Sequence, residues 1–350
     1  MDFNQLISII VSTANFYAIW LILSLSLNYE YGYTGILNFG KVLFFSLGAY
    51  SSGFLAANLA NIMAGVSFDI CSVEAVQLRL DLAKAVPQLP LLVFVASLIM
   101  GAALSAAVAY LLYISTSRIK EGFVLGIILL SAGETSRIVV RNYEPVVCGY
   151  HGLVGIPNPY TAAGDPTTAS FLLSITIWVI AGVAFLFINK LTATPYGRKL
   201  KAIRDNELAA DIYGKKPSHE RRKVLMIGSA MAGVAGVLYA YYLGFVAADD
   251  FTSLKTFDIW VAVMLGGVGN HLGAVTGSLV VTLIDRGTRV LRVFLANLSI
   301  PLETLYLRWI IVGVLMLLIL MYRPAGIIPE KSIKTLGLLR IIERIKREKT

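Results

Sequence analysis

The sequence predicts an all-α protein that crosses a membrane several times and forms a single membrane domain over residues 1–350. Hydrophobic residues make up 57% of the chain and charged residues only 15%, whereas soluble domains carry about 25% charged residues. The apolar residues fall into stretches long enough to be spans, which need about 20 residues each. The net charge of +9 is concentrated in a central loop and the C-terminal tail. This distribution is typical of orientation signals rather than of nucleic-acid binding.

About eight or nine transmembrane or half-membrane helices are expected. The N-terminal segment lacks a positively charged region and a small-residue cleavage site, so we expect it to be retained as the first span. The expected helices are residues 6–27, 33–58, 90–114, 122–140, 169–189, 224–245, 257–268, 271–285 and 304–322.

The stretch 257–285 is long for one span and is interrupted by glycines, among them Gly266, Gly267 and Gly269. Loop 190–223 and tail 323–350 are both rich in Lys and Arg, which favours the cytoplasmic side for both. An even number of crossings must therefore separate them. A broken or re-entrant 257–285 gives four crossings, whereas one continuous crossing would place the basic tail outside.

The same topology places loops 59–89 and 141–168 outside and loop 115–121 inside. Segment 286–303 would then lie outside although it carries Arg286, Arg289 and Arg292. Because apolar residues alternate with these arginines, we expect an amphipathic helix on the outer membrane surface.

Loop 190–223 is the longest polar segment between two hydrophobic halves and carries helix signals. Thr194 can cap a helix that has Pro195 at its first position. Asp205 or Asn206 can cap a second helix, and Gly214 suits a left-handed stop. Two short helices are thus predicted, at about 195–204 and 206–213. Such an ordered pair indicates a docking element for a cytoplasmic partner.

Polar residues inside the spans are the candidates for a solute path, because buried charges in a membrane face the protein interior or a cavity. Glu134 and Arg137 share a helix face, and a structural ion pair is the alternative interpretation of this spacing. Lys41 can instead extend towards the membrane surface if its helix begins late. The glycine-rich segments 32–40 and 265–273 indicate either helix breaks along the path or close helix packing.

Catalytic motifs are not found. Residues 35–42 imitate a phosphate-binding loop, but Val42 stands where Ser or Thr must bind magnesium. The three histidines lack metal-ligand spacing, and no nucleophile or paired-carboxylate motif occurs. We therefore expect a protein that is not an enzyme and needs no metal or cofactor. An intramembrane enzyme remains the competing class.

At this point a family resemblance can be stated. The matching segments are GYTGILNFG at 32–40 with LGAY at 47–50, GLVGIP at 152–157, TPYGRKLKAIRDNE at 194–207, LGGVG at 265–269 and RPAGI at 323–327. With these segments the sequence resembles permease subunits of ABC importers for branched-chain amino acids, in a wider group that includes urea and sugar permeases. Glu134 matches a glutamate common in that family, whereas Lys41 stands where histidine is common.

The resemblance implies a multi-pass protein of the plasma membrane that moves branched-chain or other hydrophobic amino acids. Urea, other amides or nucleosides are alternative solutes, and a stand-alone secondary transporter is a competing class. The implied partners are two cytoplasmic ATPase subunits, which hydrolyse ATP, a second related permease and an extracytoplasmic solute-binding protein. No nucleic acid is expected.

Two sets of site residues follow from these interpretations. ATPase coupling is assigned to Pro195, Gly197, Arg198, Ala202, Ile203, Arg204, Asp205, Asn206, Ala209 and Gly214. The solute path is assigned to Tyr33, Gly35, Asn38, Gly40, Lys41, Glu134, Arg137, Gly266, Gly267 and Gly269. Cys71 and Cys148 fall on the same outer side, where oxidation is permitted, so we predict that they form a disulfide; two unpaired thiols are the alternative.

Overall fold

A computed structural model describes residues 3–66, 68–116, 122–297 and 304–330. The long apolar stretches form helices because, in a membrane, a helix satisfies its own backbone hydrogen bonds. The first half contains α1 (Phe3–Leu27), a π-helix (Asn28–Gly32), α2 (Lys41–Ala64), α3 (Val73–Ala85), α4 (Leu89–Thr116), α5 (Gly122–Asn142), α6 (Glu144–Val147) and strand β1 (Leu153–Val154). The second half contains α7 (Pro166–Ala193), α8 (Pro195–Asp205), α9 (Glu207–Ile212), α10 (Pro217–Leu243), β2 (Phe245–Val246), α11 (Ser253–Gly266), α12 (His271–Asn297) and α13 (Thr304–Tyr322).

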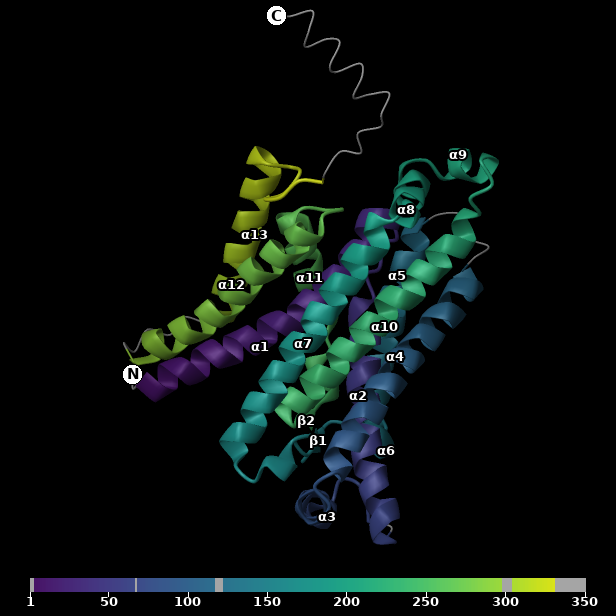
Figure 1. Cartoon of the computed structure of the whole chain (residues 1–350). Coiled ribbons are helices and arrows are strands. Elements are labelled where there is room, and N and C mark those ends of the chain that lie inside the picture. The colour runs from purple at the N-terminus through teal and green to yellow at the C-terminus, as the bar shows by residue number, and fades with distance from the viewer. Residues whose placement is uncertain (1–2, 67, 117–121, 298–303, 331–350) are drawn as a thin grey trace, which may run out of the picture.

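The helices run between two opposite ends of the molecule (Figure 1). Helices α8 and α9 lie at one end, called here the basic end, and α3, α6 and the β1–β2 pair lie at the other, the lobe end. Within the described residues, six helices are long and apolar enough to cross a membrane. They are α1 with its π-helical extension, α2, α4, α5, α7 and α10.

Helices α2 and α10 form the centre of the bundle. In their most apolar windows, 72% and 78% of the residues are buried, against 22–28% in α4, α5 and α7. Gly48 of α2 and Gly233 of α10 make this packing possible, because a Cβ atom on Gly48 would overlap the carbonyl of Gly233. Gly101 of α4 meets the same contact. These glycines therefore serve close helix packing, as expected for small residues between membrane helices.

The expected helix at 33–58 is wrong in its first part. Helix α2 begins only at Lys41, and residues 35–38 are neither helix nor strand. Gly35 adopts a left-handed φ of 72°, which a glycine reaches without strain. The helical pattern was overestimated because this unwound segment is as apolar as the helix that follows it.

The break in 257–285 is confirmed. Helix α11 ends at Gly266, and Gly267 and Gly269 have φ values of 124° and 78° before α12 begins at His271. Helices α11 and α12 are therefore two separate helices, joined by the turn at 267–270.

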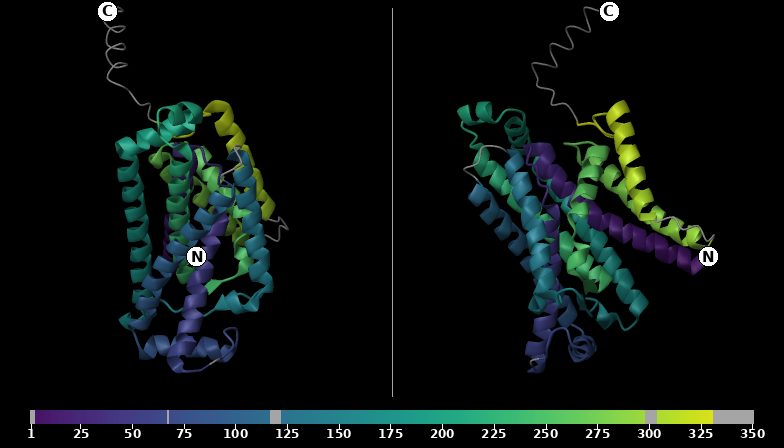
Figure 2. Two further views of the ribbon diagram at one scale, coloured as in Figure 1. Left: turned by 90° about the vertical axis from the view of Figure 1, so that its right-hand side faces the viewer. Right: turned by 180° about the vertical axis from the view of Figure 1, so that it is seen from behind.

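The expected separate helix at 286–303 is wrong for its described part. Residues 286–297 continue α12, which forms an arm with α13 and the first half of α1 (Figure 2). The turn at 267–270 restarts the helix, and nothing in the following sequence ends it.

The lobe end contains two features that periodicity did not predict. Helix α3 forms within loop 59–89, with Ser72 accepting a hydrogen bond from the Ala75 amide as its N-cap. Strands β1 and β2 pair antiparallel, with Leu153 opposite Val246. Arg79 of α3 donates to the carbonyls of Ile70 and Val154, so it fastens α3 to this pair.

Cys71 and Cys148 are bonded in the structure, with their Cα atoms 5.4 Å apart. We expect no free thiol in the unreduced, denatured protein. The bridge closes a loop across a sequence separation of 77 residues, which corresponds to about 4 kcal/mol in the loop-entropy model. Thiol titration checks this expectation, and two reactive thiols per chain would contradict it. The same titration after reduction is the control.

Candidate functional site

The basic end is organised by α8, whose start is determined locally. The hydroxyl of Thr194 accepts a hydrogen bond from the Tyr196 amide, and Pro195 occupies the first helical position. Gly197 lies against the end of α7, where a Cβ atom would overlap the carbonyl of Thr192. Leu200 and Ile203 are fully buried. Helix α8 is therefore built into the membrane body rather than suspended from it, and a side chain on Gly197 would displace it.

Helix α9 differs from α8 because it projects from the body of the protein. Asn206 caps it by accepting from the Ala209 amide, and Gly214 ends it with a φ of 74°. Leu208, Ile212 and Tyr213 are 78%, 85% and 81% exposed. Two large apolar side chains of this six-residue helix and that of Tyr213 directly after it form an unpartnered patch at this end, called here the α9 patch.

Arg204 joins α8 to the first broken helix and to the C-terminal segment. Its Nη1 donates to the carbonyl of Gly32 and lies 3.0 Å from a carboxylate oxygen of Glu330. Lys201 of α8 pairs with the other oxygen of Glu330 at 2.6 Å. Burial opposes the charge of Arg204, but hydrogen bonds with Glu330 and Asp205 raise its pKa above the ordinary value. Arg204 is therefore a permanently charged link.

A stack of side chains continues this link to the second break. The ring of Tyr33 lies parallel to that of His271, with centroids 5.0 Å apart, and Lys201 Nζ lies 4.8 Å from the Tyr33 ring centroid. His271 Nε2 is 2.7 Å from the hydroxyl of Thr192. Asn28 accepts from the amide of Gly269 at 2.8 Å. The breaks at 33–40 and 267–270 therefore meet beneath α8.

The C-terminal segment 323–330 also binds the second break, at the end of α11. The amides of Ile327 and Ile328 donate to the carbonyls of Leu265 and Gly266. Asn270 donates to the carbonyl of Pro329 at 3.0 Å. These bonds satisfy carbonyls left open at the end of α11. Segment 323–330 thus connects the end of α11, through Glu330, with Arg204 of α8.

The unwound segment 35–40 is held by a buried ion pair. Lys41 Nζ lies 2.7 Å from Glu30 and 3.1 Å from the carbonyl of Gly228, and both charged side chains are fully buried. Asn38 donates to the second oxygen of Glu30 at 2.9 Å. The alternative expectation, that Lys41 extends towards the membrane surface, is therefore wrong. Asn38 and Lys41 anchor the break in this conformation.

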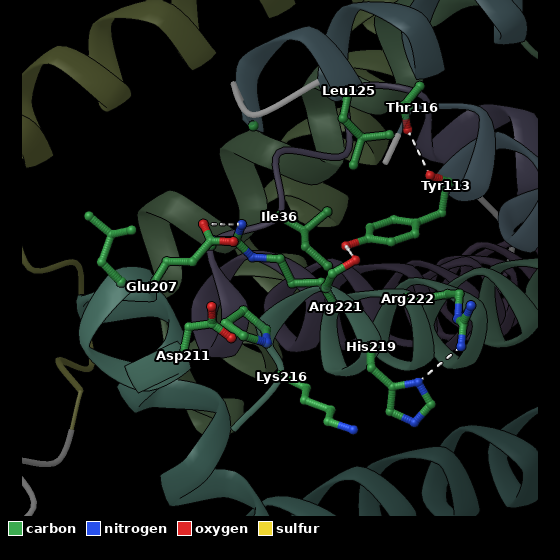
Figure 3. Close-up of a pocket in the computed structure, with 15 residues that line it drawn as sticks. Ile36, Tyr113, Thr116, Leu125, Glu207, Asp211, Lys216, His219, Arg221 and Arg222 are labelled. Atoms are coloured by element: carbon green, nitrogen blue, oxygen red, sulfur yellow. Dashed lines mark hydrogen bonds and ion pairs between the residues drawn. The ribbon is translucent and has the colours of Figure 1, made fainter. Parts of the chain in front are cut away.

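A groove of 850 Å³ opens at the basic end between α9, the start of α10 and the ends of α4 and α5 (Figure 3). Gly35 and Ile36 of the unwound segment line it. Glu207 of α9 and Arg221 of α10 pair across it at 2.6 Å. The groove thus connects the α9 patch with the first helix break.

Glu134 and Arg137 lie far from this end, on α5. Arg137 Nε is 2.8 Å from Glu134, and its Nη1 is 3.0 Å from Asp249. Glu134 also accepts from the backbone amide and the hydroxyl of Ser253, at the first turn of α11. At 1.5 Å per residue, Glu134 lies about 18 Å along α5 from Gly122, near the middle of a membrane.

The residues predicted for the solute path fall into three groups in the structure. Tyr33, Gly266, Gly267 and Gly269 meet beneath α8, whereas Gly35, Asn38 and Gly40 belong to the unwound segment and Lys41 begins α2 directly after it. Glu134 and Arg137 form the third group. Sequence reasoning missed Glu30, Asp249, His271 and Glu330. Charge at helix ends was the available signal for Glu30 and Asp249, but the pairing of Asp249 with Arg137 joins residues 112 positions apart.

The comparisons with known proteins agree on one family. A family model described as the permease component of a branched-chain amino acid transport system matches residues 9–320. A probable branched-chain amino acid transport permease protein LivM of Methanocaldococcus jannaschii is 32% identical over 334 residues, which cover 91% of this chain and 93% of the relative. The high-affinity LivM permease proteins of Salmonella typhimurium and Escherichia coli are 26% and 25% identical over 341 residues, covering 91% of this chain and 70% of theirs.

No solved structure matches. The family match extends over both helix breaks, α8, α9 and the charged group on α5. The chain therefore belongs to the family of permease components of branched-chain amino acid transport systems and is a multi-pass protein of the plasma membrane.

Proposed function

We propose that this permease carries branched-chain amino acids across the plasma membrane in an ABC importer, with ATP hydrolysed by separate cytoplasmic subunits. Two ATPase subunits, a second related permease and an extracytoplasmic solute-binding protein complete the assembly. The whole chain acts as one membrane domain, with the basic end in the cytoplasm and the lobe end outside.

The α9 patch is the observation that carries the proposal. Leu208, Ile212 and Tyr213 would leave a large apolar surface in water unless a partner covers it. The adjoining groove has charged walls, which a polar protein surface complements better than lipid does. An ATPase bound here lies next to α8, because Asn206 is both the last cap of α8 and the first cap of α9.

A solute path along α5, shared with the second permease, is the other part of the proposal. Glu134 and Arg137 are 34% and 20% exposed at mid-membrane depth in the isolated chain. Charged groups at that depth are costly against lipid, so this face of α5 must meet water or protein. Glu134, Arg137 and Asp249 thus mark the side of the subunit that borders the path.

Cysteine crosslinking tests the docking surface. A cysteine replacing Leu208 or Ile212 is expected to crosslink to the ATPase subunit in membranes, because these positions project furthest from the body. A cysteine at Ala202 is expected to react less, because α8 is half-buried there. Ser170→Cys, which is exposed at the lobe end, is the matched control and should give no crosslink. Labelling of Leu208→Cys only from outside the cell would refute both docking and topology.

A further inference from the structure

A group of charged side chains between the middle of α5 and its lobe end contains both signs and joins two separate elements. Arg137 of α5 pairs with Glu134 on its own helix and with Asp249, which precedes α11. Arg141 lies 3.5 Å from the same oxygen of Asp249. The side chain of Asp249 is 44% exposed. The group is therefore accessible, unlike the sealed pair of Glu30 and Lys41.

A buried aromatic contact borders this group on the side of α2. The side chain of Tyr50 on α2 is 4% exposed, and its ring packs against Phe251, with centroids 5.2 Å apart. Phe251 follows Asp249 by two residues, so this contact holds the segment that carries Asp249 against α2.

The charges match the two ends of an amino-acid zwitterion. In this structure Arg137 and Asp249 satisfy each other, so neither is left unpaired at a depth where an isolated charge is costly. A solute that brings both a carboxylate and an ammonium group can separate them and leave every charge paired. A neutral solute such as urea, or one with a single charge, cannot make this exchange.

We propose that Arg137 and Asp249 form a transient recognition site that selects zwitterionic α-amino acids. Arg137 receives the solute carboxylate through its planar fork of donors, and Asp249 receives the ammonium group. Glu134 keeps Arg137 oriented while the ion pair with Asp249 is open. This inference rests on the proposed function and extends it, because it assigns selectivity within the permease itself.

The test uses the complete importer in proteoliposomes, with leucine uptake measured against inhibition by 4-methylpentanoate, 3-methylbutylamine and urea. Each of the first two compounds carries only one of leucine's charges. Arg137→Gln and Asp249→Asn are each expected to raise the KM for leucine about tenfold or more, the effect of losing one charge-assisted hydrogen bond. Arg137→Lys should recover part of the loss, because it restores the charge without the fork.

The preference of the importer for leucine over its single-charge analogues distinguishes a recognition role of Arg137 from a merely structural one. If the site recognises both ends of leucine, Arg137→Gln should also reduce the preference for leucine over 3-methylbutylamine, which lacks the carboxylate. Arg289→Gln on α12 is the matched control, because Arg289 is 61% exposed and pairs with Asp285 outside this group. Permease levels and ATPase co-purification are measured for each variant.

Two results would overturn the inference. One is a leucine KM within twofold of the wild type in both Arg137→Gln and Asp249→Asn. The other is an unchanged ratio of leucine to single-charge analogues in both variants. Either result leaves the proposed function intact if the wild type still carries leucine. A wild-type importer that carries urea and not leucine would refute both together.

Discussion

Replacing Arg204 with alanine is expected to uncouple ATP hydrolysis from uptake while the ATPase stays bound. Arg204 lies behind the docking surface, on the buried side of α8, and holds the carbonyl of Gly32 and the carboxylate of Glu330. Its loss removes the direct bond from α8 to Gly32 and leaves Lys201 as the remaining α8 partner of Glu330, without altering the α9 patch. Coupling free energies between protein sites are typically about 1–3 kcal/mol, so uptake should fall roughly 5- to 150-fold.

The experiment compares the ratio of solute moved to ATP hydrolysed in proteoliposomes. Glu330→Gln should behave like Arg204→Ala but more weakly, because an amide still accepts a hydrogen bond from Arg204 while the ion pairs with Arg204 and Lys201 are lost. Lys190→Ala, an exposed cation at the end of α7, is the control. Normal coupling in Arg204→Ala would show that force reaches the helix breaks by another route.

Replacing Lys41 with methionine is expected to destabilise the permease severely. The substitution leaves Glu30 fully buried with Asn38 as its remaining side-chain partner. Breaking a buried ion pair from one side typically costs about 3–5 kcal/mol, because the uncompensated charge remains. The unwound segment 35–40 loses its anchor to Gly228 at the same time. Thermal unfolding of the detergent-solubilised protein, followed by size-exclusion fluorescence, measures the loss.

A double variant separates charge from packing. Glu30→Gln combined with Lys41→Met removes both charges and should recover much of the stability lost in Lys41→Met alone. Ser131→Ala on α5, at an exposed position away from the pair, is the neutral control. A single Lys41→Met variant as stable as the wild type would show that Glu30 is protonated in the native protein and needs no counter-charge.

Much of the basic end could be predicted because its signals are local. Thr194, Pro195, Asn206 and Gly214 act within a few residues of themselves, so capping and stop rules place α8 and α9 correctly. The break at 267–270 follows from charge parity and glycine spacing. These inferences need no knowledge of which helices are neighbours.

The unwound segment 35–40 and the continuation of α12 could not be predicted in the same way. Residues 33–40 are apolar enough to extend a span, and they are held open by contacts with distant elements, among them the bond from Lys41 to a carbonyl of α10 and the bond from Trp260 of α11 to the carbonyl of Asn38. Whether Asn38 and Lys41 line a path or anchor a break likewise depends on burial, which hydropathy does not report.

The sequence by itself determined the membrane class, the family, the positions of α8 and α9 and the helix break at 267–270. Composition, charge asymmetry and caps are properties of short segments, so they can be read from the sequence without knowledge of the tertiary structure. Only the tertiary structure decided that Arg204 meets both helix breaks, that Glu330 joins them, and that Asp249 completes the charged group of Glu134 and Arg137. These contacts link residues more than 100 positions apart, and helix packing brings them together in ways that no local pattern encodes.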